Sequence, residues 1–148
     1  MIFVPLQGYK TKAMKKAIKI LTFFLAVLLL THSTFAALEP PGLVENIAAA
    51  IKSGNSNELA KYFGPTVEII LPGSEGAFSK AQAEMIIKGF FAKSTPVSFV
   101  VNQKGNSAGG AQFIIGTYKT KSETLNVYIL LKPVSNQLMI QQMHFETD

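Results

Sequence analysis

The sequence predicts an α+β domain in which a strongly curved mixed or antiparallel β-sheet packs its concave face against an N-terminal helix pair and a third helix. Apolar residues recur at helical spacing over residues 43–51 and again over 83–91. Four segments rich in β-branched and aromatic residues follow, separated by turn-forming residues. The order of elements is helix, helix, strand, strand, helix and four strands, which favours helices layered on one curved sheet.

The first 36 residues have the features of a secretory signal peptide. Five lysines precede the apolar run at 20–30, which is shorter than the roughly 20 apolar residues that cross a bilayer. Thr34 and Ala36 are small residues suited to signal peptidase, so we expect cleavage after Ala36, and Met14 is an alternative start. We expect a periplasmic or secreted protein without a membrane span once the signal is removed. A retained membrane anchor is the alternative.

The mature chain, residues 37–148, is expected to be one domain and is formally neutral. All nine carboxylates and nine of the fourteen lysines lie after Ala36, so the net charge of +5 belongs to the signal and does not indicate a nucleic-acid partner. The chain has no arginine and no cysteine, which excludes guanidinium recognition, disulfides, thiolate zinc sites and cysteine nucleophiles. We expect no metal and no cofactor.

Three helices are predicted from their capping signals and apolar faces. The first follows Pro40 and Pro41 and ends before Gly54, and the second covers 58–63 and stops at Gly64-Pro65. Ser79 and Gln82 have the spacing of a capping box, which predicts a third helix over 80–92. The expected buried positions are Leu43, Ile47, Ala50 and Ile51, then Leu59, Tyr62 and Phe63, then Ala83, Ile86, Ile87, Phe90 and Phe91.

Six strands are predicted between turn signals, at residues 66–71, 75–78, 97–104, 111–120, 124–131 and 138–146. A two-residue turn at 121–122 or 122–123 gives the same alternation of side chains in the hairpin. The concave face then carries Ile114, Gly116, Tyr118, Leu125, Val127, Ile129 and Leu131, and the opposite face carries Phe113, Ile115, Thr117, Asn126, Tyr128 and Leu130.

The last strand leaves two orientations open. A four-residue loop would turn Leu138, Ile140, Gln142 and His144 toward the concave face. A single bulge would instead turn Met139, Gln141, Met143 and Phe145 inward.

This order of elements resembles the nuclear transport factor 2-like superfamily, the cone-shaped fold of ketosteroid isomerase, scytalone dehydratase and many polyketide cyclases. The stretches FIIGTYKT at 113–120 and LNVYILLK at 125–132 further resemble a secreted bacterial branch of it, the domain of unknown function 4783 family. The resemblance covers residues 38–147 and implies the cone fold. It implies no activity for this chain.

The candidate ligand-binding residues in the cone are Tyr62, Tyr118, Gln142 and His144. In enzymes of the superfamily, the resemblance implies a carboxylate or histidine base with a tyrosine or acid donor. The catalytic candidates here are His144 with Glu68, or His144 with Glu146, because the only aspartate is Asp148 and the mature chain has one histidine. A partly exposed histidine at a strand end is the structural alternative.

The leading hypothesis is an exported, non-catalytic domain that binds a small apolar ligand or an envelope protein. An isomerase, dehydratase or cyclase-like enzyme is the second, and a structural domain with a filled core is the third. The outward residues Phe113, Ile115, Tyr128 and Leu130 are too apolar for a face left in water, so we also predict a homodimer packed sheet against sheet.

Overall fold

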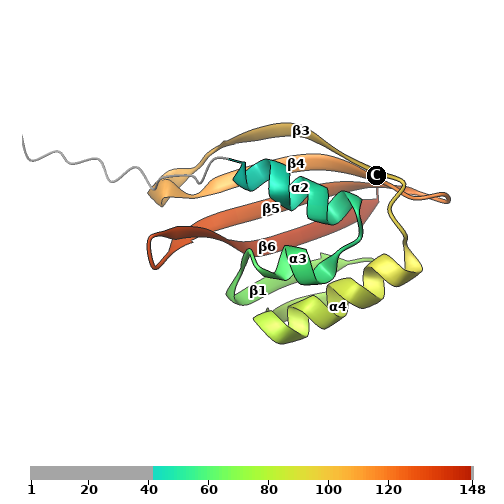
Figure 1. Cartoon of the computed structure of the whole chain (residues 1–148), viewed down its shortest axis with the longest axis horizontal. Coiled ribbons are helices and arrows are strands. Elements are labelled where there is room, and N and C mark those ends of the chain that lie inside the picture. The colour runs from blue at the N-terminus through green and yellow to red at the C-terminus, as the bar shows by residue number, and fades with distance from the viewer. Residues whose placement is uncertain (1–41, 148) are drawn as a thin grey trace, which may run out of the picture. The chain divides into compact units, whose positions relative to one another are not determined.

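The computed structural model describes residues 42–147, which form the predicted α+β arrangement of one six-stranded sheet and three α-helices (Figure 1). The predicted signal peptide, its cleavage site and Met14 lie outside these residues and stay predictions. The elements are α2 (Leu43–Lys52), α3 (Ser56–Ala60), β1 (Phe63–Leu71), β2 (Ser74–Ser79), α4 (Lys80–Lys93), β3 (Ser98–Asn106), the 3-10 turn η1 (Ala108–Gly110), β4 (Gln112–Lys119), β5 (Thr124–Val134) and β6 (Gln137–Thr147).

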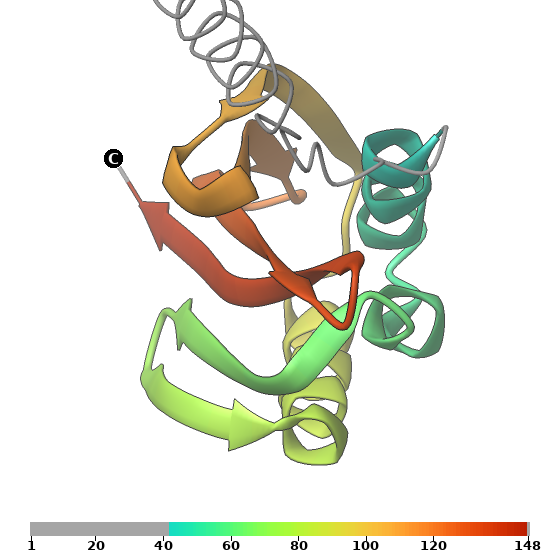
Figure 2. The ribbon, with the colours of Figure 1, turned by 90° about the vertical axis from the view of Figure 1, so that its left-hand side faces the viewer.

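The strands form a mixed sheet in the order β2-β1-β6-β5-β4-β3. Every neighbouring pair is antiparallel except β1 and β6, which run parallel. Figure 2 shows the sheet curving around the helices, which all lie on its concave side. Within residues 42–147, no helix combines the length and the apolar character needed to cross a membrane.

The capping box predicted for the third helix is confirmed, and the second helix also has a side-chain cap. The Ser79 hydroxyl accepts from the Gln82 backbone N–H at 3.4 Å, and the Gln82 side chain accepts from the Ser79 N–H at 3.1 Å, completing the capping box of α4. The Asn55 side chain accepts from the Glu58 N–H at 3.0 Å and caps α3.

The second helix is shorter than predicted, and the strand after it is longer. Helix α3 ends at Ala60, and β1 already begins at Phe63, so Gly64 and Pro65 lie inside the strand instead of ending the helix. Phe63 pairs with Ile140 before the register shifts, which accommodates a proline that has no N–H to donate.

The predicted orientation of the β4–β5 hairpin is confirmed. Lys119 pairs with Thr124, so the chain turns at Lys121 and Ser122. All seven residues assigned to the concave face are buried against the helices: Ile114, Gly116, Tyr118, Leu125, Val127, Ile129 and Leu131. The predicted faces of the three helices are also buried, with Tyr62 and Ile86 only partly so.

Strand β6 follows neither predicted orientation along its whole length. Ser135 and Asn136 form a two-residue turn with φ values of 47° and 67°, and β6 then pairs regularly until Leu131 meets Ile140. The register shifts there, because Leu130 pairs with Gln142 and leaves Gln141 as an extra residue. This bulge reverses the alternation, so Leu138 and Ile140 point inward before it, and Met143 and Phe145 after it.

The expectation that Gln142 and His144 face the cone is therefore wrong. Both lie on the convex face of the sheet, called the outer face below, because the bulge at Gln141 turns every later side chain over.

Candidate functional site

Large aromatic side chains fill the space between α4 and the sheet. The ring centroids of Phe90 and Phe145 are 4.9 Å apart, those of Tyr118 and Phe145 are 5.4 Å apart, and Phe91 stacks on Tyr118 at 6.2 Å. All four residues are buried. The helix that caps the concave sheet thus contributes a packed core at this position.

Tyr118 has a satisfied hydroxyl group within this core. Its OH donates to the carbonyl oxygen of Ser94 at the end of α4. Burial, and secondarily the carboxylate of Glu123, raise the pKa of Tyr118 far above its ordinary value. The phenol is therefore a neutral donor that holds the end of α4 to the sheet.

Gly116 allows the Phe99 ring to pack closely against the inner face of β4. A Cβ atom at Gly116 would lie 2.7 Å from the Phe99 ring and 2.8 Å from the carbonyl oxygen of Val100. The Phe99 ring and the backbone of β3 thus approach β4 closely at this glycine, where a side chain would obstruct them.

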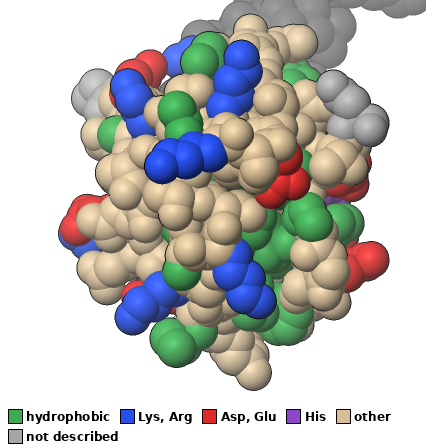
Figure 3. All heavy atoms as spheres, turned by 90° about the vertical axis from the view of Figure 1, so that its right-hand side faces the viewer, with side chains coloured by type: hydrophobic (Ala, Val, Ile, Leu, Met, Phe, Trp, Pro, Cys, Tyr) green, Lys and Arg blue, Asp and Glu red, His purple; other side chains and the backbone are tan. Residues whose placement is uncertain are grey.

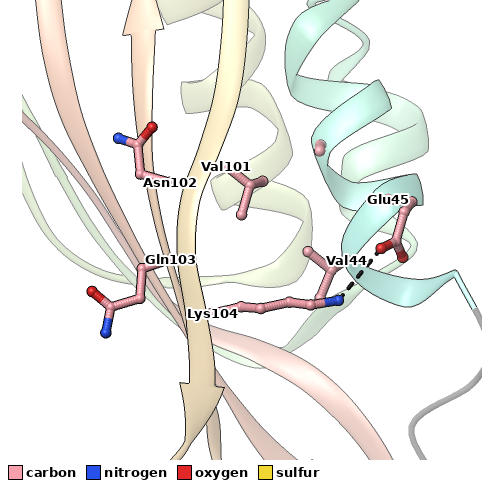
Figure 4. Close-up of a pocket in the computed structure, with 7 residues that line it drawn as sticks. Val44, Glu45, Val101, Asn102, Gln103 and Lys104 are labelled. Atoms are coloured by element: carbon pink, nitrogen blue, oxygen red, sulfur yellow. Dashed lines mark hydrogen bonds and ion pairs between the residues drawn. The ribbon is translucent and has the colours of Figure 1, made fainter.

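A groove of about 310 Å³ lies between α2 and β3 (Figure 4). Its apolar surface comes from Val44, Ala48 and Val101. Asn102 is an extra residue in β3, so Val101 and Lys104 point toward α2 while Asn102 and Gln103 point away.

An exposed ion pair bridges this groove. The Lys104 Nζ lies 3.4 Å from the Glu45 Oε1, and the two side chains are 53% and 66% exposed. A backbone hydrogen bond and the Lys104 ammonium group lower the pKa of Glu45. The two charges at the groove neutralise each other, so the groove has no unpaired charge to select a ligand of one sign.

The outer face carries two lateral rows of side chains across β1, β6, β5 and β4. The pairing of the strands aligns Ile70, His144, Tyr128 and Ile115 in one row, and Glu68, Gln142, Leu130 and Phe113 in the next. The polar members lie on β1 and β6, whereas both members on β4 are apolar. We call these eight residues the two-row patch.

The polar half of the two-row patch is a connected cluster. The Gln142 side-chain amide donates to the Glu68 Oε2 at 2.7 Å. The His144 Nε2 lies 3.8 Å from the other oxygen of Glu68, and the His144 ring is 5.7 Å from the Tyr128 ring. The Nε2 atom is buried and has no hydrogen-bond partner among residues 42–147. A hollow of about 150 Å³ beside it is lined by Ile115, Asn126, Val127, Tyr128, His144 and Glu146.

Another hollow, of about 310 Å³, lies between the end of α4 and the β4–β5 turn. Its lining includes Lys93 and Lys121 together with the hydroxyl groups of Ser94, Thr95, Thr120 and Ser122. Figure 3 views this end of the domain, where lysine side chains are scattered and hydrophobic side chains gather toward the side of the outer face.

The predicted ligand-binding residues do not converge on one cavity. Tyr118 lies in the core, Tyr62 is partly buried beside it, and Gln142 and His144 lie on the outer face. The weak catalytic candidates His144 and Glu68 do lie together, but outside the cone. The residues of the predicted dimer interface, Phe113, Ile115, Tyr128 and Leu130, share the outer face as the alternation predicted.

Sequence reasoning missed the bulge at Asn102, which brings Lys104 to Glu45. It offered a bulge in the last strand as one of two alternatives but did not place it at Gln141, where it brings His144 to Glu68. No signal in the local sequence marks either bulge. Among residues 42–147, no group of three or more His, Cys, Asp or Glu side chains is placed to hold a metal ion.

Comparison with known proteins gives a family match over almost the whole described domain. The family model "Domain of unknown function (DUF4783)" matches residues 44–146. No curated protein matches the chain.

Solved structures agree with the family match. A DUF4783 family protein from Bacteroides ovatus is 32% identical with a TM-score of 0.65, covering 70% of this chain and 93% of its own. A family member from Bacteroides uniformis is 30% identical with a TM-score of 0.68, and the match covers 72% of this chain and 97% of the Bacteroides uniformis chain. An NTF2-like protein of unknown function from Cytophaga hutchinsonii, 14% identical with a TM-score of 0.52 and covering 72% and 87%, shares the fold alone. The domain therefore has the nuclear transport factor 2-like fold, and the chain belongs to the DUF4783 family.

Proposed function

We propose that the protein is an exported, non-catalytic interaction domain that pairs with a second copy of itself through the outer face of its sheet. The two-row patch carries this proposal, because apolar side chains lie side by side on neighbouring strands of that face. Ile115 is 36% exposed, and Ile70, Phe113, Tyr128 and Leu130 are partly buried. A sheet face left in water carries mostly polar residues.

The size of the outer face supports a second copy as the occupant. Five of its strands are 8 to 11 residues long. At about 3.3 Å per residue and about 4.8 Å between strands, these five strands present a face of roughly 750 Å². A stable interface buries about 800 Å² on each partner. Two copies related by a two-fold axis would each use this same face, as closed dimers do.

The filled core and the position of the polar residues support a non-catalytic role. The aromatic rings of Phe90, Phe91, Tyr118 and Phe145 occupy the place where a ligand would lie in the cone. His144 and Glu68 lie on the opposite side of the sheet, away from that enclosed space. The basic n-region and the apolar run at 20–30 support export.

The groove between α2 and β3 favours a second candidate function, the binding of a small amphipathic ligand. Val44, Ala48 and Val101 would contact its apolar part, and Lys104 and Glu45 would contact its polar part. A native mass spectrum of the exported protein tests this candidate, because a bound ligand adds a releasable mass. Replacing Val101 with phenylalanine would fill the groove and remove that added mass.

Sedimentation velocity of the exported protein tests the proposed dimer. We expect the wild type to be a dimer at micromolar concentration. We expect Ile115→Lys to be a folded monomer, because dimerisation would have to bury an unpaired lysine charge in the interface. Met85→Lys is the matched control, since Met85 is 66% exposed on α4 and lies away from the outer face. A wild-type monomer, or an Ile115→Lys dimer of unchanged affinity, would refute the proposal.

A further inference from the structure

We propose that dimerisation through the outer face is strengthened by proton uptake at His144, which supplies the positive partner that Glu68 needs when a second copy covers it. This inference rests on the proposed function and concerns the regulation of the same face. It arises from one unusual atom, the His144 Nε2, which is buried and makes no hydrogen bond. A buried polar atom without a partner is rare in folded proteins and calls for a physical reason.

The surroundings of His144 offer that atom one charged partner. From β1, the Glu68 Oε1 lies 3.8 Å from the Nε2, a little beyond hydrogen-bond distance. From β5, the aromatic ring of Tyr128 packs at 5.7 Å. On β6, Glu146 lines the same hollow as His144. Within the part of the chain that the structure describes, the charged groups facing His144 are thus carboxylates, and no lysine lines this hollow.

In the free protomer, solvent can stabilise the Glu68 carboxylate. Its side chain is 43% exposed, and one oxygen accepts a hydrogen bond from Gln142 at 2.7 Å. A second copy packed on the face would remove that solvent. Burial of an ionised carboxylate is costly unless a positive charge compensates it, and the neutral Gln142 amide supplies none.

A protonated His144 supplies that charge without a change of backbone. Both ring nitrogens then carry hydrogens, so the Nε2 is a positively charged donor facing Glu68, whichever nitrogen carries the hydrogen in the neutral ring. A movement of about 1 Å shortens the distance between the His144 Nε2 and the Glu68 Oε1 from 3.8 Å to the length of a charge-assisted hydrogen bond. The orphaned nitrogen and the desolvated carboxylate would then satisfy each other.

The sign of the pH dependence follows from linkage. In this proposal, dimerisation is accompanied by the uptake of a proton at each His144, so a lower pH favours the dimer. The change is expected at about pH 6.5, the region in which histidine side chains ordinarily gain a proton. A two-fold dimer contains two His144–Glu68 pairs. If protonation of each pair favours the dimer over the separate protomers tenfold, protonation of both lowers the dissociation constant by roughly 100-fold.

Sedimentation equilibrium at about pH 5.5 and about pH 8, on either side of that range, tests the inference. We expect the wild-type dimer to dissociate at least tenfold more readily at the higher pH. His144→Gln keeps a polar side chain but cannot take up a proton, so its association should not depend on pH over this interval. Glu68→Gln removes the charge that must be compensated, so it should dimerise at both pH values.

Different outcomes overturn different claims. A wild-type dimer of equal affinity at both pH values, or one that is tighter at the higher pH, would overturn the role of His144 and leave the dimer itself standing. A wild-type monomer at both pH values would overturn the proposed function. Circular dichroism of each variant at both pH values separates a loss of association from a loss of folding. Retention of the full pH dependence in a folded His144→Gln variant would also overturn the inference.

Discussion

Replacing Gly116 with alanine adds one methyl group where the inner face of the sheet is tightly packed. The new Cβ would lie 2.7 Å from two atoms of the Phe99 ring and 2.8 Å from the carbonyl oxygen of Val100. The ring can turn away, but the carbonyl oxygen belongs to the backbone of β3. Strand β3 must therefore move for the methyl group to fit.

Overpacking of this kind costs about 1–3 kcal/mol of unfolding free energy. Alanine recovers about 0.5–1 kcal/mol of it, since glycine loses more backbone entropy on folding. Because one obstructing atom belongs to the backbone, we expect an overpacking cost in the upper half of that range. The net effect of Gly116→Ala is then a destabilisation of about 1–2 kcal/mol. For a domain of this size, each kcal/mol corresponds to roughly 4 °C in Tm, so the Tm should fall by about 4–8 °C.

Gly89→Ala is the matched control, because it makes the same chemical change in the exposed part of α4. No atom lies within 4 Å of a Cβ built there, so the methyl group meets no obstacle. We expect Gly89→Ala to stabilise the domain by about 0.5–1 kcal/mol, the difference between the helix propensities of the two residues. Thermal and urea denaturation of both variants measure the contrast. If Gly116→Ala raises the Tm as Gly89→Ala does, the inner face contains free space and the filled-core interpretation fails.

Three further predictions concern the core, a helix cap and a turn. Tyr118→Phe should lower the unfolding free energy by about 1 kcal/mol, because the partly buried Ser94 carbonyl loses its donor. Because burial raises the pKa of Tyr118, the unfolded chain releases the phenolic proton before the folded protein does, starting at about pH 10. The unfolding free energy of the wild type should therefore be constant below about pH 10 and fall above it. Urea denaturation should show a smaller fall at alkaline pH in Tyr118→Phe. Ser79→Ala should cost about 1 kcal/mol by removing the cap of α4, whereas Ser79→Asp should retain most of the stability. Asn136→Val should lower the unfolding free energy by at least about 1 kcal/mol, because a β-branched residue is strained at the φ of 67° that Asn136 adopts, whereas Asn136→Gly should be tolerated. Equal Tm values for these two variants would contradict the left-handed turn.

Local chemistry in the sequence was sufficient to predict most of the elements. The capping box at Ser79 and Gln82 predicted the start of α4 at the correct residue. The alternation on either side of Lys121 and Ser122 predicted which side chains of β4 and β5 face the helices. These signals act over four residues or fewer, so each is readable without the rest of the fold.

The orientation of β6 depends on contacts that a local pattern does not contain. Residues 138–145 alternate less clearly between apolar and polar types, and both predicted orientations placed some apolar side chains outside. Ile140 and Met143 are three positions apart, so a regular strand would turn them to opposite faces of the sheet. The bulge at Gln141 allows both side chains to be buried on the concave face. It forms where β6 lies between β5 and β1, which are distant from each other in the sequence.

The sequence by itself thus determined the order of elements, the buried faces of the helices and the outward apolar residues of β4 and β5, because each depends on the spacing of neighbouring residues. Tertiary structure alone decided that aromatic rings fill the cone and that His144 meets Glu68 on the outer face. Those outcomes depend on one extra residue in β6 and on the parallel pairing of β1 with β6. A shift of one residue moves every later side chain to the other face of a strand. One bulge, set by contacts with strands distant in the sequence, therefore decides on which face of the sheet His144 lies.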